Sequence, residues 1–470
     1  MEHRLLVATN TERVGHIGFD AAQDQYTFNY TQAWPGREGA FPLSPHIPLT
    51  GDVPRSGVVH RFLANLLPEG RALEIASVMY QMSKDNIFGL VRMLGKEPVG
   101  ALSFLAEAAR GQDAGVAQSA EGPAEPAIAI ELEPIRREIS NEELSARIRE
   151  RDNIPFPVWD GKVRLSVAGY QDKLQVLVDE ADGRIFLVEG SLSSTHILKP
   201  ETRNAHTPFM VANEHFCMTF ARRLRLPVAP VTLRRTPDPV LLIERFDRIV
   251  ERSPENPQQA LKVLRRHVID GCQALDLPVT FKYERNFGNT PDVRNIREGV
   301  SFEKLFSLTP HLDNPAAART YMIRWALLQL LVGNSDAHGK NFSFFVGEAG
   351  IQPTPMYDLV SVNAYGESVE QEMAMGYGDE FRIENITPYA LADFAHRTGT
   401  RPAMLAREMQ RMANAALKIA PELAREAFYT AEERELVQRV SDFVCGQAGL
   451  FLKLAPSVPK VDRALFQASA

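Results

Sequence analysis

The sequence is poor in the features that would mark a secreted, membrane-bound or zinc-binding protein. It has only three cysteines in 470 residues (Cys217, Cys272 and Cys445), which are widely spaced and form no metal-ligand pattern. No segment approaches the roughly 20 apolar residues that a membrane helix needs, and residues 1–10 lack the apolar run of a signal peptide. These absences predict a cytoplasmic protein from a reducing compartment, without contact to a membrane.

Positive charge is also scarce. The chain carries 52 lysines and arginines against 59 aspartates and glutamates, which gives a formal net charge of −7. Its surface is therefore not expected to coat nucleic acid. The apolar share of 44% is ordinary for a globular protein with a core, and 470 residues suggest two or three domains.

The centre of the sequence is a polar loop, Gly333–Lys340, between an apolar run that ends a predicted helix and the strand-like run Phe342–Val346. The loop carries Asp336, and Asn341 follows five residues later. The same spacing occurs in the catalytic loop of protein kinases, where the aspartate orients and deprotonates the acceptor hydroxyl and the asparagine holds a magnesium ion. Although such a pair is common by chance, its position between a helix and a strand favours a phosphoryl-transfer site.

A second metal ligand is expected on the next strand. Residues 351–358 read IQPTPMYD and end at Asp358, and Gly347–Gly350 can form the turn of a hairpin. Kinases place an aspartate here to bridge the metal to the phosphates. Taken alone, Asp358 favours a turn or a helix cap, but Asp336 and Asn341 upstream reverse that preference.

Two upstream segments are candidates for binding the phosphates of a nucleotide. Residues 163–178, VRLSVAGYQDKLQVLV, have two strand-like runs around Gly169, which lets backbone amides approach a phosphate. This turn has neither G-x-G-x-x-G nor a Walker A motif, so a plain β-turn stays equally open. The strand Ile197–Lys199 ends in a lysine like the one that neutralises the nucleotide phosphates in kinases, and Asn213 and Glu214 on the following predicted helix are its plausible partners. A solvated surface lysine is the alternative.

The segment Val240–Asp247, VLLIERFD, is a candidate for binding the adenine base of a nucleotide. An apolar strand that emerges into Glu244, Arg245 and Phe246 offers backbone groups that can pair with the edge of adenine. The alternative is an ordinary buried strand.

The order of predicted elements divides the chain into four parts. An α+β module is followed by a stretch rich in Ala, Glu, Gly and Pro, which is typical of a flexible linker. Ser140 and Glu143 then form a capping-box pattern, where ordered structure is expected to resume. Later, Val263–Leu275 is predicted as an amphipathic helix and Lys282–Val300 as an exposed loop. The four parts are residues 1–105, the linker 106–139, a strand-rich part 140–250 and a helical part 251–470.

The motifs, taken in order, resemble the HipA-type toxin serine/threonine kinases. The motifs are RLSVAGYQDK, THILKP, NEHFCMTFAR, ERFDR, GNSDAHGKNFS and MYDLVS, with NLLPEG and PVGALSF for the family's N-terminal module. The resemblance covers nearly the whole chain apart from the linker and the tail. It implies an α+β, bilobal, phosphatidylinositol-kinase-like fold with an N-terminal subdomain, a β-rich N-lobe and a mainly helical C-lobe. It also implies ATP and Mg²⁺ as cofactors.

The resemblance implies a role for each motif residue. Asp336 would be the catalytic base, Lys199 would hold the phosphates, and Asn341 and Asp358 would bind magnesium. Ser166 matches the serine that this family autophosphorylates to switch itself off. The implied nucleotide-binding residues are Ala168, Gly169, Tyr170, Gln171, Asp172, Lys173, Lys199, Glu244, Arg245, Phe246, His338, Gly339, Lys340, Asn341, Tyr357 and Asp358.

The resemblance also implies partners. Family members are neutralised by a small helix-turn-helix antitoxin, HipB-like, which binds operator DNA, so contact with DNA is expected only through the antitoxin. Their known targets are aminoacyl-tRNA synthetases, glutamyl-tRNA synthetase first among them. Two other hypotheses stay open: a small-molecule or lipid kinase on the same scaffold, and a catalytically weak co-repressor platform for an antitoxin. The presence of all the expected catalytic residues argues against the platform.

Overall fold

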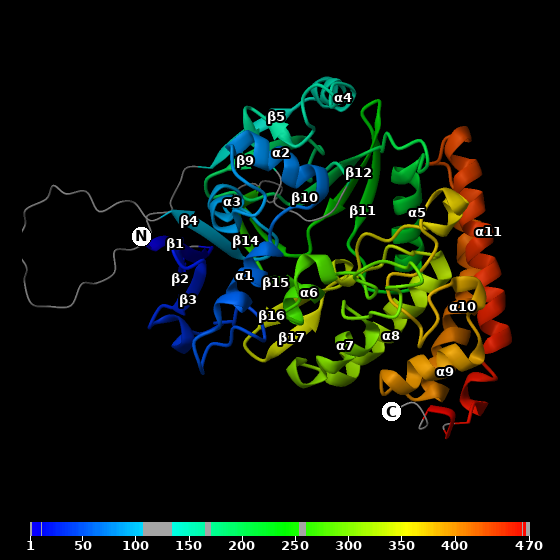
Figure 1. Cartoon of the computed structure of the whole chain (residues 1–470). Coiled ribbons are helices and arrows are strands. Elements are labelled where there is room, and N and C mark those ends of the chain that lie inside the picture. The colour runs from blue at the N-terminus through cyan, green and yellow to red at the C-terminus, as the bar shows by residue number, and fades with distance from the viewer. Residues whose placement is uncertain are drawn as a thin grey trace, which may run out of the picture.

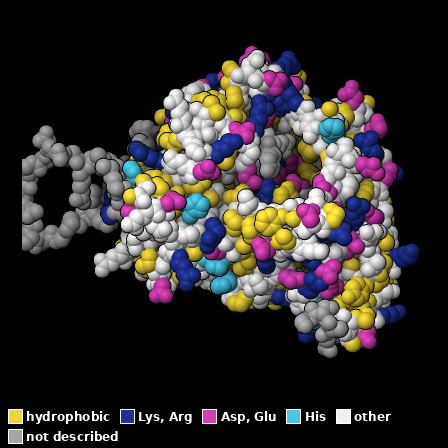
Figure 2. Space-filling model, viewed as in Figure 1, with side chains coloured by type: hydrophobic (Ala, Val, Ile, Leu, Met, Phe, Trp, Pro, Cys, Tyr) yellow, Lys and Arg dark blue, Asp and Glu magenta, His cyan; other side chains and the backbone are white. Residues whose placement is uncertain are grey.

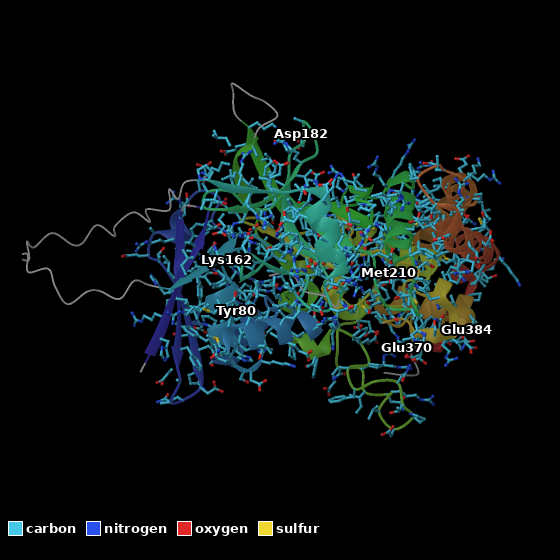
Figure 3. The ribbon with its side chains drawn as sticks, turned by 90° about the horizontal axis from the view of Figure 1, so that it is seen from above. Tyr80, Lys162, Asp182, Met210, Glu370 and Glu384 are labelled. Atoms are coloured by element: carbon cyan, nitrogen blue, oxygen red, sulfur yellow. The ribbon has the colours of Figure 1, made fainter. Side chains whose placement is uncertain are left out.

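The computed structural model describes residues 2–10, 12–106, 134–164, 171–252, 260–462 and 464–466. Figure 1 shows an N-terminal sheet with its helices on one side, a larger sheet above, and a group of long helices on the other side. Seen from above in Figure 3, Tyr80 and Lys162 lie toward the N-terminal sheet, whereas Glu384 lies toward the C-terminal helices. Within the described ranges, no helix has the length and apolar character to cross a bilayer.

The N-terminal module is a four-stranded antiparallel sheet covered by helices. The sheet has the order β3-β2-β1-β4, and its strands alternate so that Leu5, Val7, Ile17 and Phe28 are buried. The predicted α+β character of this module is confirmed. The elements are β1 (Glu2–Thr9), β2 (Glu12–Asp20), β3 (Gln25–Tyr30), α1 (Ser56–Ala64), α2 (Gly70–Tyr80), α3 (Ile87–Leu94) and β4 (Leu102–Ala106).

A six-stranded sheet forms the next layer. Its order is β11-β12-β10-β8-β9-β5, and α4 (Asn141–Arg149) packs Leu144 and Ile148 against it. The Ser140 side chain accepts a hydrogen bond from the Glu143 amide and so caps α4, as predicted. The strands are β5 (Ile135–Ile139), β8 (Leu174–Val178), β9 (Ile185–Glu189), β10 (His196–Pro200), β11 (Val231–Arg235) and β12 (Pro239–Glu244); a small pair, β6 (Val158–Trp159) and β7 (Lys162–Val163), lies outside this sheet.

The C-terminal part is mainly helical, and its core is continuous with that of the N-terminal module. One cluster of buried apolar side chains includes Leu5 and Phe62 of the module as well as Leu327 and Leu423 of the helical part. The module is therefore packed onto the rest of the chain. The helices are α5 (Met210–Arg223), α6 (Gly271–Ala274), α7 (Phe302–Ser307), α8 (Pro315–Val332), α9 (Pro388–Arg397), α10 (Pro402–Ala424) and α11 (Ala431–Leu454).

Three predictions about secondary structure and exposure were wrong. The expected helix Val263–Leu275 is instead β14 (Ala260–Arg265), β15 (Val268–Asp270) and the single turn α6. Its strands pair with β13 (Arg248–Arg252) and with β16 (Ser343–Gly347), and this distant pairing overrides the local helical pattern. Residues 135–139, placed in the linker, form the edge strand β5 against β9. Residues 282–300 are not simply exposed, because Lys282 and Glu284 are buried.

Candidate active site

The loop that follows α8 is fixed by a sharp left-handed turn. Helix α8 is buried over its last two turns and ends at Gly333, which has φ of 66°. A Cβ at this position would lie 2.6 Å from the Phe443 ring, so only glycine fits both the turn and the space. The Asn334 amide then donates to the Gln329 carbonyl at 3.0 Å, which starts the loop in a defined direction.

The loop brings Asp336 and Asn341 together. The Asn341 side-chain amide donates to the Asp336 carbonyl at 2.9 Å, across the turn η4 (Gly339–Asn341). The Tyr283 hydroxyl donates to Asp336 Oδ1 at 2.6 Å. Asp336 is exposed to solvent, yet desolvation by the surrounding protein raises its pKa, while this hydrogen bond and the nearby Lys282 charge oppose the rise. A carboxylate held in this way can accept a proton from a neighbouring hydroxyl.

A buried ion-pair group lies next to this loop. Lys199, on β10, donates from Nζ to both oxygens of Glu214 on α5, at 2.8 and 3.0 Å, and also contacts Asp358 Oδ1. The Lys199 and Glu214 side chains are 5% and 1% exposed. Burial opposes the charge of Lys199, but the Asp358 and Glu214 carboxylates outweigh it and raise the pKa of Lys199. Lys199 is therefore a fixed cation, and the predicted pairing with Glu214 is present.

Asp358 has an unusual backbone and a strongly favoured charge. Its φ is 57°, the left-handed region that side chains other than glycine rarely adopt. Burial would raise the pKa of Asp358, but the charges of Lys199 and Lys173 outweigh burial and hold it well below its usual range. The Asp358 carbonyl accepts from the side chain of Asn334 at 3.5 Å, which places this residue against the Asp336 loop, and the Asp358 charge contributes to the raised pKa of Asp336. Figure 2 shows the surface hollowed between the large sheet and the helical part, with acidic and basic side chains inside.

Part of the predicted phosphate loop can be placed. Lys173, at the start of β8, is buried, and burial together with the charge of Lys199 lowers its pKa to about 8. Gln171 donates to the Pro200 carbonyl at 3.5 Å, and Asp172 lies 3.8 Å from Arg151. Lys173 therefore belongs to the same charged group as Lys199. Ser166, Ala168, Gly169 and Tyr170 lie outside the described residues.

The end of β12 lies beside the segment that carries Asp358. This segment follows β17 (Gly350–Pro353) and is irregular at Asp358, so the expectation that Asp358 ends the strand was wrong. The Phe246 ring is 5.6 Å from the ring of Tyr357. The Tyr357 hydroxyl donates to the Lys340 carbonyl at 2.7 Å and lies 2.6 Å from the Ser343 hydroxyl. Glu244, at the end of β12, is exposed. The predicted hinge is thus joined to the catalytic loop through Tyr357.

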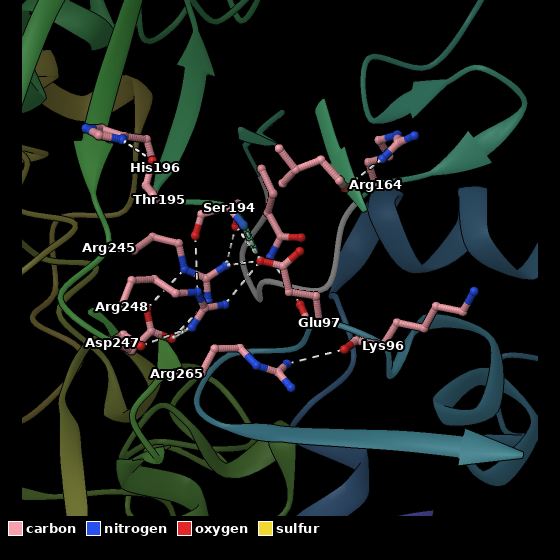
Figure 4. Close-up of polar contacts among 12 residues, drawn as sticks. Lys96, Glu97, Arg164, Ser194, Thr195, His196, Arg245, Asp247, Arg248 and Arg265 are labelled. Atoms are coloured by element: carbon pink, nitrogen blue, oxygen red, sulfur yellow. Dashed lines mark hydrogen bonds and ion pairs between the residues drawn. The ribbon is translucent and has the colours of Figure 1, made fainter. Parts of the chain in front are cut away.

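Arg245 does not direct its side chain toward this site. Its guanidinium donates to Asp247 at 3.0 and 2.9 Å and to the Ser194 hydroxyl at 3.0 Å, in a buried group that also holds Glu97 of the N-terminal module (Figure 4). Its backbone amide donates to the Thr195 carbonyl. The prediction that the Arg245 side chain binds the nucleotide is therefore not supported by its position, because the carboxylate of Asp247 already holds it.

A cavity of about 400 Å³ lies beside that buried group, between the N-terminal sheet and the large sheet. Its walls include Lys96, Glu97, Arg164 and Arg265. None of the predicted site residues for which coordinates are described lines it. The cavity is thus separate from the Asp336 loop.

The residues between Asp336 and Asn341 point in different directions. The His338 ring meets the Tyr283 ring edge-on at 5.1 Å, and burial lowers its pKa well below the usual value, so this imidazole is neutral at pH 7. A Cβ on Gly339 would lie 2.5 Å from Val300. Lys340 turns away and donates to the Asn65 carbonyl at 2.9 Å, with Asp270 as its ion-pair partner. The Lys340 side chain therefore holds the N-terminal module and not a phosphate.

Sequence reasoning missed the residues that support the loop from behind. Tyr283 contacts Asp336, Lys282 pairs with Glu69 at 2.7 Å, and Asn65 receives Lys340. Asn65 and Glu69 belong to the NLLPEG motif, which in the sequence indicated only the family resemblance. The polar residues of this motif stand among apolar ones, which could have marked them as buried contacts. Nothing in the neighbouring sequence indicates that they contact a loop about 270 residues away.

The site's oxygen atoms suit a magnesium ion bound together with phosphates. The Asn341 side-chain nitrogen is engaged by the Asp336 carbonyl, which leaves the amide oxygen for a cation. The Asp358 carboxylate supplies a second hard oxygen ligand. Within the described ranges, no three His, Cys, Asp or Glu side chains gather into a metal site of their own. The two oxygen ligands from Asp358 and Asn341 suit Mg²⁺, which is usually bound by one or two protein carboxylates plus substrate phosphates.

Comparison with known protein families and proteins gives a consistent result. The chain matches the family model described as HipA N-terminal domain over residues 5–105 and the one described as HipA-like C-terminal domain over residues 165–420. It is 42% identical over 402 residues to the serine/threonine-protein kinase toxin HipA of Shewanella oneidensis, covering 85% of this chain and 84% of that protein. It is 28% identical to the putative kinase Y4mE of Sinorhizobium fredii, covering 95% and 96%.

A solved structure of similar shape agrees with these matches. The chain superimposes on a structure titled as the HipA, HipB and operator DNA complex of the Shewanella oneidensis MR-1 toxin–antitoxin system. The TM-score is 0.81 and the sequence identity 37%, and the match covers 97% of this chain and all of that one. At this identity and coverage, the shared fold extends over nearly the whole molecule.

Proposed function

The chain belongs to the HipA family of serine/threonine-protein kinase toxins, and from that premise we propose that its active site transfers the γ-phosphoryl group of ATP, with Mg²⁺, to a serine or threonine of a protein substrate. The observation that carries this proposal is the meeting of two groups from distant parts of the chain. These are the buried pair Lys199–Glu214 with its half-buried partner Asp358, and the loop that holds Asp336 and Asn341; the two groups meet where the Asn334 side chain donates to the Asp358 carbonyl at 3.5 Å. Kinases use such a set to hold the phosphates, hold the metal and orient the acceptor.

In the proposed reaction, each residue has one task. Lys199 neutralises the nucleotide phosphates, and Glu214 fixes its direction. Asp358 and the Asn341 amide oxygen would hold Mg²⁺, which would supply neutralising charge to the phosphates. Asp336 accepts the proton of the acceptor hydroxyl as the new O–P bond forms and the bond to the β-phosphate oxygen breaks, which leaves ADP. Phe246 and the end of β12 take the adenine.

We further propose that the protein is the toxin of a type II toxin–antitoxin pair. The Shewanella oneidensis protein whose structure it resembles was solved in complex with HipB and operator DNA. A HipB-like helix-turn-helix antitoxin is therefore the proposed partner here, and DNA contact would come through it. A net charge of −7 agrees with a chain that does not bind DNA on its own. The proposed place of action is the cytoplasm, where such a pair and its substrate would meet.

The proposed substrate is an aminoacyl-tRNA synthetase, with glutamyl-tRNA synthetase first. The support is family membership alone, because acceptor choice depends on surface shape. Ser166 is the proposed autophosphorylation site that switches the kinase off, since a phosphate would add about −1.5 to −2 charges beside the triphosphate. The proposed division of the chain keeps residues 1–105 as the N-terminal module, starts the N-lobe at β5, and separates the lobes near residue 250.

A phosphoproteome tests the proposed function. The protein and its Asp336→Asn variant are each induced briefly without antitoxin, and phosphosites are quantified by mass spectrometry. The proposal expects growth arrest and new phosphoserine or phosphothreonine on a synthetase with the unaltered protein only. Arrest with a new phosphorylated lipid or metabolite, and no protein site, would favour a small-molecule kinase. Arrest with both proteins and no new phosphate would favour the co-repressor platform.

A further inference from the structure

Tyr283 lies directly against the proposed base. It follows the turn η2 (Val279–Phe281), in a segment that precedes the catalytic loop by about 50 residues. Its hydroxyl donates to Asp336 Oδ1 at 2.6 Å, and its ring lies edge-on to His338 at 5.1 Å. A phenol at this distance is a strong donor to a carboxylate. Tyr283 therefore fixes one oxygen of Asp336 and leaves Oδ2 for an incoming hydroxyl.

The residue before Tyr283 is tied to the N-terminal module. Lys282 Nζ pairs with Glu69 Oε2 at 2.7 Å, and the two side chains are only 6% and 9% exposed. The Lys282 carbonyl accepts the amide of Gly339, in the catalytic loop, at 2.8 Å. Breaking a buried pair leaves an uncompensated charge, so Lys282 is strongly held in place. Glu69 is thus linked to the catalytic loop through Lys282.

The residue after Tyr283 is anchored in the same way on the other side. Glu284 is buried, accepts from Arg297 at 2.6 Å and from the Gly376 amide at 2.7 Å, and its own amide donates to the Ala374 carbonyl. Tyr283 therefore stands between two anchored neighbours, and its backbone has little freedom. This is the arrangement expected for a side chain whose exact direction matters.

We propose that Tyr283 is a positioning residue for Asp336, and that Glu69 of the N-terminal module sets its place through the buried pair with Lys282. The inference rests on the proposed role of Asp336 and adds two residues to it. No proton leaves Tyr283: its hydroxyl donates a hydrogen bond that holds the Asp336 carboxylate in one rotamer. The N-terminal module then helps to position the base, because Glu69 is linked to Asp336 through Lys282 and Tyr283.

The first test is Tyr283→Phe, which removes only the hydroxyl. The rate of phosphoryl transfer at saturating MgATP is expected to fall roughly 10- to 100-fold, because a small misplacement of a reacting group has effects of this size. MgATP affinity and the thermal midpoint should not change. The matched control is Tyr377→Phe, whose hydroxyl donates at the same 2.6 Å to the Ala326 carbonyl in the buried core. It is expected to lower the thermal midpoint and leave the transfer rate unchanged.

Two results of the first test would overturn the proposal. An unchanged rate in Tyr283→Phe would show that the hydrogen bond does not position Asp336. A faster rate would show that Tyr283 blocks the place of the acceptor hydroxyl. Asp336→Asn is measured beside it: if that variant keeps full activity, the proposed function fails, whereas an inactive Asp336→Asn with a normal Tyr283→Phe defeats only this inference.

The second test asks whether Glu69 acts through Tyr283. Glu69→Gln is expected to lower the transfer rate with unchanged MgATP affinity, and the double variant with Tyr283→Phe should be no slower than the slower single variant. Multiplied losses would mean that Glu69 acts by another route. Because Glu69→Gln can also loosen the fold, the exchanged pair Glu69→Lys with Lys282→Glu is measured too. Restored activity supports the ion pair as the cause, and a stable but inactive exchanged pair contradicts it.

Discussion

Glu214→Gln is a sharp perturbation of the site because it changes charge and leaves shape almost intact. Glu214 has a 1% exposed side chain and holds Lys199 with both carboxylate oxygens, at 2.8 and 3.0 Å. Removing one partner of a buried ion pair typically costs about 3–5 kcal/mol. Lys199 keeps a contact with Asp358, so we expect the lower end, about 3 kcal/mol of unfolding free energy.

The transfer rate of Glu214→Gln should fall by more than its lower folding stability explains. Without Glu214, Lys199 is left with Asp358 as its partner, where it would compete with the proposed magnesium ion for the carboxylate. We expect the transfer rate per MgATP encounter to fall by roughly 100-fold, as for other displaced positioning groups. The assay combines thermal unfolding with steady-state transfer over a range of MgATP concentrations.

The control for this prediction is Glu408→Gln. Glu408 on α10 is 7% exposed and binds Arg324 at 2.9 Å and Arg411 at 2.8 Å, in the helices of the C-lobe. It should lose stability without losing transfer. Two results would contradict this prediction. One is a Glu214→Gln variant that transfers phosphate at the rate of the unaltered protein, and the other is a Glu408→Gln variant whose transfer rate falls as much as that of Glu214→Gln.

Three further predictions concern Asp358, Lys173 and Ser166. Asp358→Ala should weaken nucleotide binding only when magnesium is present, which calorimetry with Mg²⁺ and with EDTA checks; an unchanged magnesium dependence would place the metal elsewhere. Lys173 has a pKa of about 8 in the folded chain, against an ordinary value of 10.5. As the pH rises from 8 to 10.5, the folded chain loses this proton before the unfolded chain does, so the free energy of unfolding should rise by about 3 kcal/mol. Lys173→Met should lose that rise, as denaturation at a series of pH values would reveal, and should bind MgATP less tightly. Incubation with MgATP should phosphorylate Ser166 and lower ATP affinity; an unmodified Ser166, or a modified one with full affinity, contradicts the switch.

Local patterns predicted the part of the site that is local in the chain. Helix α8, the turn at Gly333 and the pair Asp336 and Asn341 lie within 30 residues, so spacing alone places them. The Lys199–Glu214 pair was also predicted, because a strand followed closely by a helix brings residues 15 apart together. These contacts depend little on the rest of the fold.

Distant contacts decided what the sequence could not predict. Arg245 and Lys340 look like nucleotide ligands in their motifs, yet Asp247 and the distant Asn65 hold their side chains elsewhere. The strands β14 and β15 looked helical because their apolar residues recur at helical spacing, and only pairing with β13 and β16 makes them strands. Tyr283 gave no signal, since its importance comes from a hydrogen bond to a residue 53 positions away.

The most direct measurement of the central claim is a single-turnover experiment on Asp336→Asn. Protein in excess over labelled MgATP is mixed with an acceptor protein, and the transfer rate and MgATP affinity are measured in the same preparation. General-base assistance is worth about 10²- to 10⁴-fold. We expect a loss of transfer in that range with unchanged MgATP affinity, because this variant leaves Lys199 and Asp358, the proposed nucleotide and metal ligands, in place. Transfer at the unaltered rate would contradict it and show that Asp336 is not the base.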